Sequence, residues 1–106
     1  MKFYRALYVG EQLNKTKDHV IEKLEKKEWQ LDVYLIVLAK GEQNQLEIFH
    51  SVLLMQDKID GEDLFVVGIA KGFHEALTML EKITQEVYEK TGDTKIQTYI
   101  LEKENE

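Results

Sequence analysis

Five short segments of the chain are rich in apolar, aromatic and β-branched residues, and this pattern predicts five strands. The segments are residues 2–9, 29–41, 45–56, 64–70 and 95–101. In the second segment, Leu31 and Val33 alternate with polar neighbours before the pattern becomes continuously apolar up to Ala39. A continuous apolar run indicates that both faces of a strand are covered. The short polar turn at residues 41–44 predicts that the second and third strands form an antiparallel hairpin.

Two other segments show the period of an amphipathic helix. The longer one starts after Gly72 and continues to Gly92, which stands where a left-handed residue commonly ends a helix. Its apolar stripe consists of Phe73, Ala76, Leu77, Leu80, Ile83, Val87 and Tyr88. The shorter one has a thin stripe, and Asn14 or Thr16 is available to cap its start. That stripe consists of Leu13, Val20, Ile21 and Leu24.

The order of these elements is β-α-β-β-β-α-β, which predicts a single α+β domain over residues 1–106 with a mixed five-stranded sheet and two helices. Residues 102–106 are expected to form a frayed tail. Two helices on one face of the sheet would make a two-layer sandwich, and one helix on each face would make three layers. We favour the two-layer sandwich on the sequence alone.

Two helices cannot easily cover both faces of five strands that are this apolar. We therefore expect a homodimer in which sheet faces, or a sheet face and a helix, pack across a two-fold axis. The alternative is that Phe and Tyr side chains cover the open face within one chain.

The composition narrows the class of protein. The chain has 106 residues, of which 43% are hydrophobic and 32% charged, and its formal net charge is -6. An acidic chain is a poor partner for DNA phosphates, so no nucleic-acid partner is expected. The longest apolar run, residues 33–39, is too short to cross a bilayer, and the start lacks an apolar signal core. We expect a cytoplasmic protein with no membrane partner; the absence of cysteine excludes disulfides and thiolate metal sites.

The turn from the fourth strand into the long helix is the first candidate for chemistry. It places backbone amides at the positive end of a helix, so Lys71, Gly72 and His74 form a candidate anion-binding site. The spacing of Gly68 and Gly72 does not match a phosphate loop. The simpler interpretation is that Gly68 lets the helix approach the strand, Gly72 makes the turn, and Glu75 complements the first helical turn.

His50 is the second candidate, as an acid-base group. It has the same strand parity as Ile48 and Val52, so we expect it to point into an apolar layer, as a core or interface histidine does. The three histidines show no metal-binding pair in sequence, and no metal site or cofactor is expected. The acidic turn at residues 57–63 does not match a calcium loop and is expected to be solvated.

The sequence therefore favours a small cytoplasmic, homodimeric, non-enzymatic module that binds a partner protein or a small ligand. The alternative is a small enzyme or ligand sensor with an anion site near Lys71-Gly72, in which His50 or His74 acts as the acid-base group. No motif for nucleophilic catalysis supports the alternative, because the single serine, Ser51, lies within a predicted strand.

Overall fold

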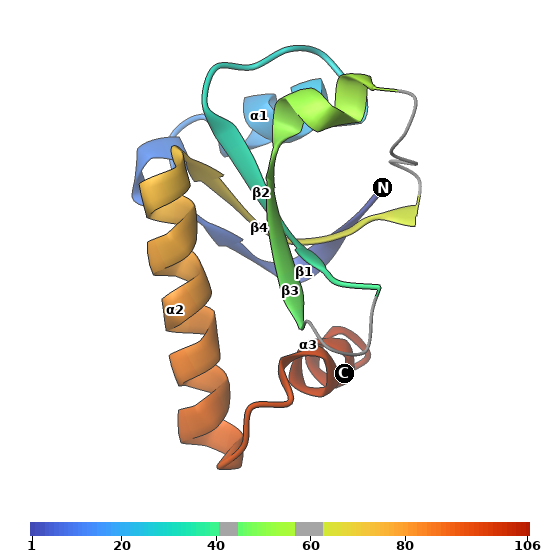
Figure 1. The fold of residues 1–106 in the computed structure, drawn as a ribbon. Helices are drawn as coiled ribbons and strands as arrows, with labels where there is room; N and C mark the ends of the chain where they lie inside the picture. The colour runs from blue at the N-terminus through green and yellow to red at the C-terminus, as the bar shows by residue number, and fades with distance from the viewer. Residues whose placement is uncertain (41–44, 57–62) are drawn as a thin grey trace.

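Four strands form one mixed sheet at the centre of the structure (Figure 1). They are β1 (Lys2–Val9), β2 (Val33–Leu38), β3 (Leu46–His50) and β4 (Phe65–Lys71), in the spatial order β1-β4-β2-β3. β1 runs parallel to β4, whereas β2 runs antiparallel to both β3 and β4. The computed structural model describes residues 1–40, 45–56 and 63–106. The predicted pairing of the second and third strands is confirmed, and the turn at 41–44 lies outside the described residues.

Three α-helices surround the sheet: α1 (Lys17–Glu25), α2 (Phe73–Thr91) and α3 (Ile96–Glu104). The long helix predicted after Gly72 is confirmed as α2. Gly92 ends it in the left-handed conformation, with a φ of 77°, and its N–H donates to the Tyr88 carbonyl at 2.8 Å. The predicted first helix corresponds to α1, although Leu13 belongs to a separate 3-10 turn at Glu11–Leu13.

The fifth strand, predicted at residues 95–101, is wrong, because this segment forms most of α3. Ile96 and Ile100 lie one helical turn apart, and both are buried against the sheet. The Gln97 side-chain amide donates to the carbonyls of Ala39, at 2.7 Å, and Gln45, at 3.0 Å. These contacts hold the start of α3 at the end of the β2–β3 hairpin, so the described residues form a sheet of four strands and three α-helices.

The predicted frayed tail at residues 102–106 is also wrong for its first part, because α3 continues to Glu104. The Glu104 side chain is buried and accepts a hydrogen bond from the backbone N–H of Arg5 at 2.8 Å. The Arg5 guanidinium donates to the carbonyls of Glu104, at 3.2 Å, and Glu106, at 2.9 Å. The end of α3 therefore covers the outer edge of β1.

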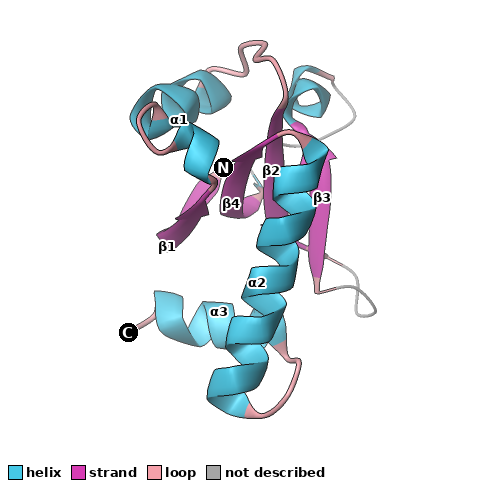
Figure 2. Cartoon of the chain, turned by 90° about the vertical axis from the view of Figure 1, so that its left-hand side faces the viewer, coloured by secondary structure: helices cyan, strands magenta, loops and turns pink. Residues whose placement is uncertain are grey.

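Both faces of the sheet are covered, so the two-layer prediction is corrected to three layers (Figure 2). On β2, Leu35 packs in one core with α1, whereas its neighbour Ile36 packs in a second core with α2 and α3. The α1 side also contains Leu13, Val20, Leu24, Val33, Val37, Leu54, Val66 and Ile69. The α2–α3 side also contains Tyr4, Val67, Ala70, Ala76, Met79, Ile83, Val87, Ile96 and Ile100. The sequence suggested a dimer because one sheet face was expected to be open. Since both faces are covered, this reason for a dimer no longer holds.

Two predicted strands are shorter than their apolar segments. The segment 29–41 becomes extended only at Val33, because Asp32 directly before it takes a left-handed backbone conformation with a φ of 54°. The segment 45–56 stops pairing at His50 and continues as a 3-10 turn, Ser51–Met55. The ring of His50 caps this turn, since its Nδ1 accepts the Val52 N–H at 3.0 Å.

Candidate ligand-binding pocket

The parallel strands β1 and β4 end side by side, and the chain leaves them toward opposite faces of the sheet. β1 continues into the 3-10 turn at Glu11–Leu13 and then α1, which pack on one face. β4 continues into α2, which packs on the other face. Such a switch point leaves a crevice at the carboxyl ends of the two strands, which is where open α/β sheets bind ligands.

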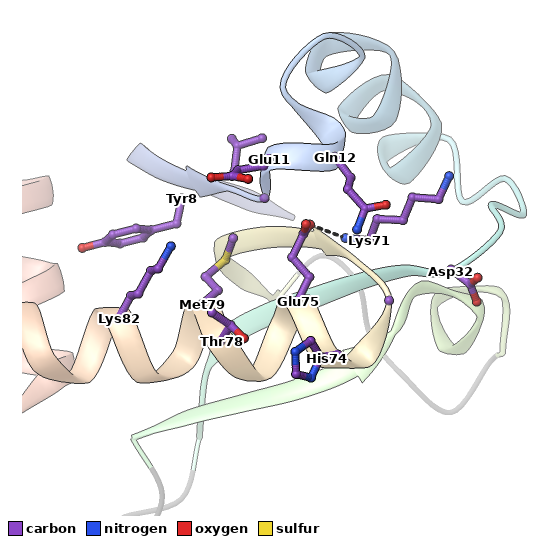
Figure 3. A pocket seen from close by; sticks show the side chains of 13 residues that line it. Tyr8, Glu11, Gln12, Asp32, Lys71, His74, Glu75, Thr78, Met79 and Lys82 are labelled. Carbon is purple, nitrogen blue, oxygen red and sulfur yellow. Dashed lines mark hydrogen bonds between the residues drawn. The ribbon is translucent and has the colours of Figure 1, made fainter.

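An open pocket of about 620 Å³ lies at this switch point (Figure 3). Its walls come from the end of β1 and the turn after it, the end of β4, and the first turns of α2. This volume falls in the range of pockets that hold small molecules. The fold thus provides a cavity at the place where its topology predicts one.

The structure brings three of the four candidate site residues to this pocket. Lys71, Gly72 and His74 all line it. His50 does not line it, and instead lies on β3 with its ring edge-on to Tyr34 at a centroid distance of 4.9 Å. The His50 ring accepts the Val52 N–H and contacts Tyr34, so His50 has a structural role outside the pocket.

The start of α2 is built by Gly72 and Glu75, as the simpler interpretation predicted. Gly72 has a φ of 83° and a ψ of 151°, a backbone conformation that glycine adopts almost alone. The Glu75 carboxylate then folds back and accepts the Lys71 N–H through Oε1 at 2.9 Å. An acidic group of the chain therefore already satisfies one amide of the turn that the anion hypothesis assigned to a ligand.

Gly10 is a part of this pocket that the sequence analysis missed. A Cβ atom at this position would overlap the Glu75 carboxylate. The backbone at Gly10 is extended, with a φ of -61° and a ψ of 147°, so its conformation alone would admit any residue. Glycine at this position leaves room for the Glu75 side chain, which reaches it from α2.

The Gly10→Ala substitution is expected to displace the Glu75 carboxylate and to free the Lys71 N–H. The lost hydrogen bond should lower the free energy of unfolding by about 0.5–1.5 kcal/mol, measured by urea denaturation. The Lys71 amide should also exchange faster with solvent. In a double-mutant cycle, Glu75→Ala should lower the free energy of unfolding by a similar amount. The double variant should lower it no more than either single substitution does. Additive costs would show that Gly10 and Glu75 do not act together.

Gly68, on β4, is confirmed as the point where α2 approaches the sheet closely. A Cβ atom there would come within 2.6 Å of the Met79 Sδ atom and 3.3 Å of the Tyr8 carbonyl. The close approach places Met79 against the floor of the pocket, between β1 and α2.

Charged side chains of both signs surround the pocket. Lys71 and Lys82 supply positive charge, and Glu11, Asp32 and Glu75 supply negative charge. Figure 3 shows Lys82 pointing toward Tyr8 at one end of the pocket, and Lys71 and Asp32 lying at the other end. The arrangement suits a polar ligand with groups of both signs better than a purely anionic one.

Beyond Lys82, a polar cluster joins the end of the pocket to α3. The hydroxyls of Tyr8 and Tyr99 both donate to Oε2 of Glu86, at 2.7 and 2.8 Å. Burial and then the bond to Glu86 raise the pKa of Tyr8 well above its ordinary value, and raise the pKa of Tyr99 to about 12. Burial acts to raise the pKa of Glu86, but the two tyrosine bonds, with Lys103 and Lys90, outweigh it and lower that pKa.

Within residues 1–40, 45–56 and 63–106, no three His, Cys, Asp or Glu side chains come together as a metal site requires. None of the helices in this described part of the chain has the length and apolar character needed to span a bilayer. A scan against protein-family models gives no match, and searches of curated proteins and of solved structures give none either.

Proposed function

We propose that this chain is a small-molecule-binding module, and that its ligand occupies the pocket at the carboxyl ends of β1 and β4. The observation that carries the proposal is the coincidence of a topological switch point with a pocket of about 620 Å³. Ligand sites in open sheets form at such points because the connections there diverge and leave room.

The charges around the pocket indicate the chemical class of the ligand. An acidic group of a small polar metabolite could pair with Lys71 or Lys82. A cationic or hydrogen-bond-donating group could bind Glu11 or Asp32. Val9 and Met79 add apolar contact beside these charges. Small zwitterions such as amino acids, and small phosphorylated or carboxylated metabolites, are the compounds to test first.

We favour binding over catalysis because the two candidate acid-base histidines do not belong to the same site. His74 lines the pocket, but His50 lies outside it and caps the turn after β3. The alternative, an enzyme or sensor using His74 as an acid-base group, shares the same pocket. A bound compound that is recovered chemically changed would favour the enzyme.

The expected result is a rise in melting temperature with at least one compound from a panel of amino acids, inorganic phosphate, phosphorylated sugars and carboxylic acids. At a hundredfold excess over Kd, a ligand stabilises the folded state by about 2.7 kcal/mol, which raises Tm by roughly 10 °C or more in a domain of this size. The binding compound should shift the amide resonances of Gly10, Gly72 and His74.

A pair of lysine substitutions on α2 provides the control. Lys82→Gln removes a charge at the pocket and should weaken binding about tenfold, the effect of losing about 1.4 kcal/mol. Lys90→Gln makes the same change two turns further along α2, outside the pocket lining, and should leave the affinity unchanged. No binding by any compound in the panel, or amide shifts confined to another surface, would contradict the proposal.

A further inference from the structure

We infer that the outer edge of β3 pairs with the same edge of a second copy of this chain across a two-fold axis, and that the flank of α2 nearest to β3 packs in the same interface. The inference is independent of the proposed ligand, because the surface lies on the flank of α2 away from the pocket. It rests on the edge strand, on an apolar stripe beside it, and on the fit of both to the same symmetry axis.

The two edge strands of the sheet, β1 and β3, differ in whether their outer backbone groups are paired. At β1, the outward N–H of Arg5 donates to Glu104, and the end of α3 lies against the strand. At β3, no backbone group of the described residues pairs with the outer edge. An uncovered edge strand exposes a row of donors and acceptors that can pair with another strand.

The register identifies which groups of β3 face outward. The Ala39 N–H donates to the Gln45 carbonyl, so this pair exchanges hydrogen bonds with β2, and every second residue along β3 does the same. The intervening residues Leu46 and Ile48 therefore direct their N–H and C=O groups away from β2. The N–H of His50 does the same, whereas its carbonyl belongs to the 3-10 turn that His50 caps. The close ring contact between His50 and Tyr34 agrees with a pair that exchanges no backbone bonds.

The α2 helix adds an apolar stripe beside this edge. Phe73, Leu77 and Tyr88 are exposed, at 51%, 38% and 60%, and with Leu80 they follow one flank of the helix. The ring of Phe73 lies 5.7 Å from that of Tyr34 on β2, so this flank faces the β2–β3 side of the sheet (Figure 2). Glu75 and Lys82, which line the pocket, lie on the other flank.

The chemistry of β3 favours a second copy as the occupant. Antiparallel pairing about Ile48 places Leu46 opposite the second copy's His50 and pairs all five residues of the strand. In this register Glu47, the one charged residue of β3, lies opposite Phe49. A register shifted to bring Glu47 opposite itself would place like charges together, which is unfavourable. The same two-fold axis brings the two α2 stripes to one side of the joined sheet, where they add apolar contact to a strand pair that is marginal alone.

The test compares two exposed leucines that receive the same substitution. Wild-type protein is expected to sediment as a dimer at high micromolar concentration and to dissociate on dilution. Leu77→Lys should raise the dimer dissociation constant at least tenfold, because it places charge in the apolar stripe. Leu101→Lys, on α3 at a similar exposure of 42%, should leave the dissociation constant unchanged. Both positions are exposed, so both variants are expected to fold, and circular dichroism checks this.

Amide hydrogen exchange on the full chain provides the second measurement. The N–H groups of Leu46, Ile48 and His50 should be protected at high concentration and should exchange at least tenfold faster in Leu77→Lys. A protein that stays monomeric at every concentration would overturn the inference, as would a dimer that leaves these amides unprotected. Protection that appears only with an added peptide of another sequence would also overturn it, in favour of a different strand at this edge.

Discussion

Replacing Ile100 with alanine is expected to lower the free energy of unfolding by about 2–5 kcal/mol, which is a large part of the stability of a domain of this size. Ile100 is completely buried between α3 and the sheet, where it packs in the same core as Ile36 and Ile83. The substitution removes apolar contact and leaves a cavity that the rigid sheet cannot close. Urea denaturation followed by far-ultraviolet circular dichroism measures the change.

The neighbouring residue provides the control for this prediction. Leu101 is exposed on the outer side of α3, so Leu101→Ala should change the free energy of unfolding by less than about 0.5 kcal/mol. In a strand, Ile100 and Leu101 would point to opposite faces of a sheet, and the helix separates them by about 100°. Equal effects of the two substitutions would contradict the packing of α3 described above.

The second large effect is expected from Glu86, whose carboxylate accepts hydrogen bonds from Tyr8 and Tyr99. Glu86→Gln should lower the free energy of unfolding at neutral pH by about 1–3 kcal/mol, because bonds to a charged acceptor are stronger than bonds to a neutral amide. A cycle with Tyr99→Phe isolates the contribution of the pair. The two substitutions should be strongly non-additive, since each removes the same hydrogen bond.

The same cluster contributes to the dependence of stability on pH. The raised pKa values of Tyr8 and Tyr99 mean that the folded state favours the protonated phenols, so this contribution is complete below pH 10 and decreases as the pH rises toward about 12. The lowered pKa of Glu86 contributes stability above its ordinary value of 4.5, and this contribution decreases as the pH falls through the lowered pKa. Glu86→Gln should remove the contribution at acid pH and should reduce, without abolishing, the one at alkaline pH, because burial is the largest cause of the raised pKa values of Tyr8 and Tyr99.

Denaturation at a series of pH values and ultraviolet titration of tyrosinate measure these effects. In the wild type, Tyr99 should ionise well above pH 10, and in Glu86→Gln it should ionise closer to pH 10. Tyr99→Phe identifies its contribution to the titration curve. An unchanged curve in Glu86→Gln would contradict the assigned role of the carboxylate.

Local pattern was enough to predict β1, β4 and α2. The α2 stripe continues for about four turns, and the helix ends at a glycine C-cap; β1 and β4 are apolar segments that end at glycine or lysine-glycine turns. In each of them, local preference and tertiary packing favour the same structure. The α+β class follows from these elements.

The α3 segment could not be assigned from pattern alone, because its residues fit two periods. Ile96, Thr98 and Ile100 alternate with Gln97 and Tyr99 as a strand would require, and the segment is rich in β-branched residues. Ile96 and Ile100 also match a helix at a spacing of four. The choice is made by tertiary contacts, since both isoleucines face one core and the Gln97 amide reaches the hairpin carbonyls.

The candidate site was predictable only in part for a similar reason. A helix start after Lys71-Gly72 is a local feature, and Glu75 is the acidic residue expected in its first turn. That Gly10 lies beside Glu75 depends on the parallel pairing of β1 with β4, which joins residues about 60 positions apart. Long-range pairing of this kind leaves no periodic signal, so the pocket and its switch point emerge only from the fold.

The position of β1 has a consequence for synthesis on the ribosome. This strand is made about 60 residues before its partner β4, and Arg5 is made 99 residues before the Glu104 carboxylate that covers the outer edge. Until then, both edges of a largely apolar segment stay open, and the nascent chain resembles an aggregation-prone intermediate. Because contacts this distant in sequence form slowly, a chaperone that shields the open edges of β1 is expected to raise the yield of folded protein.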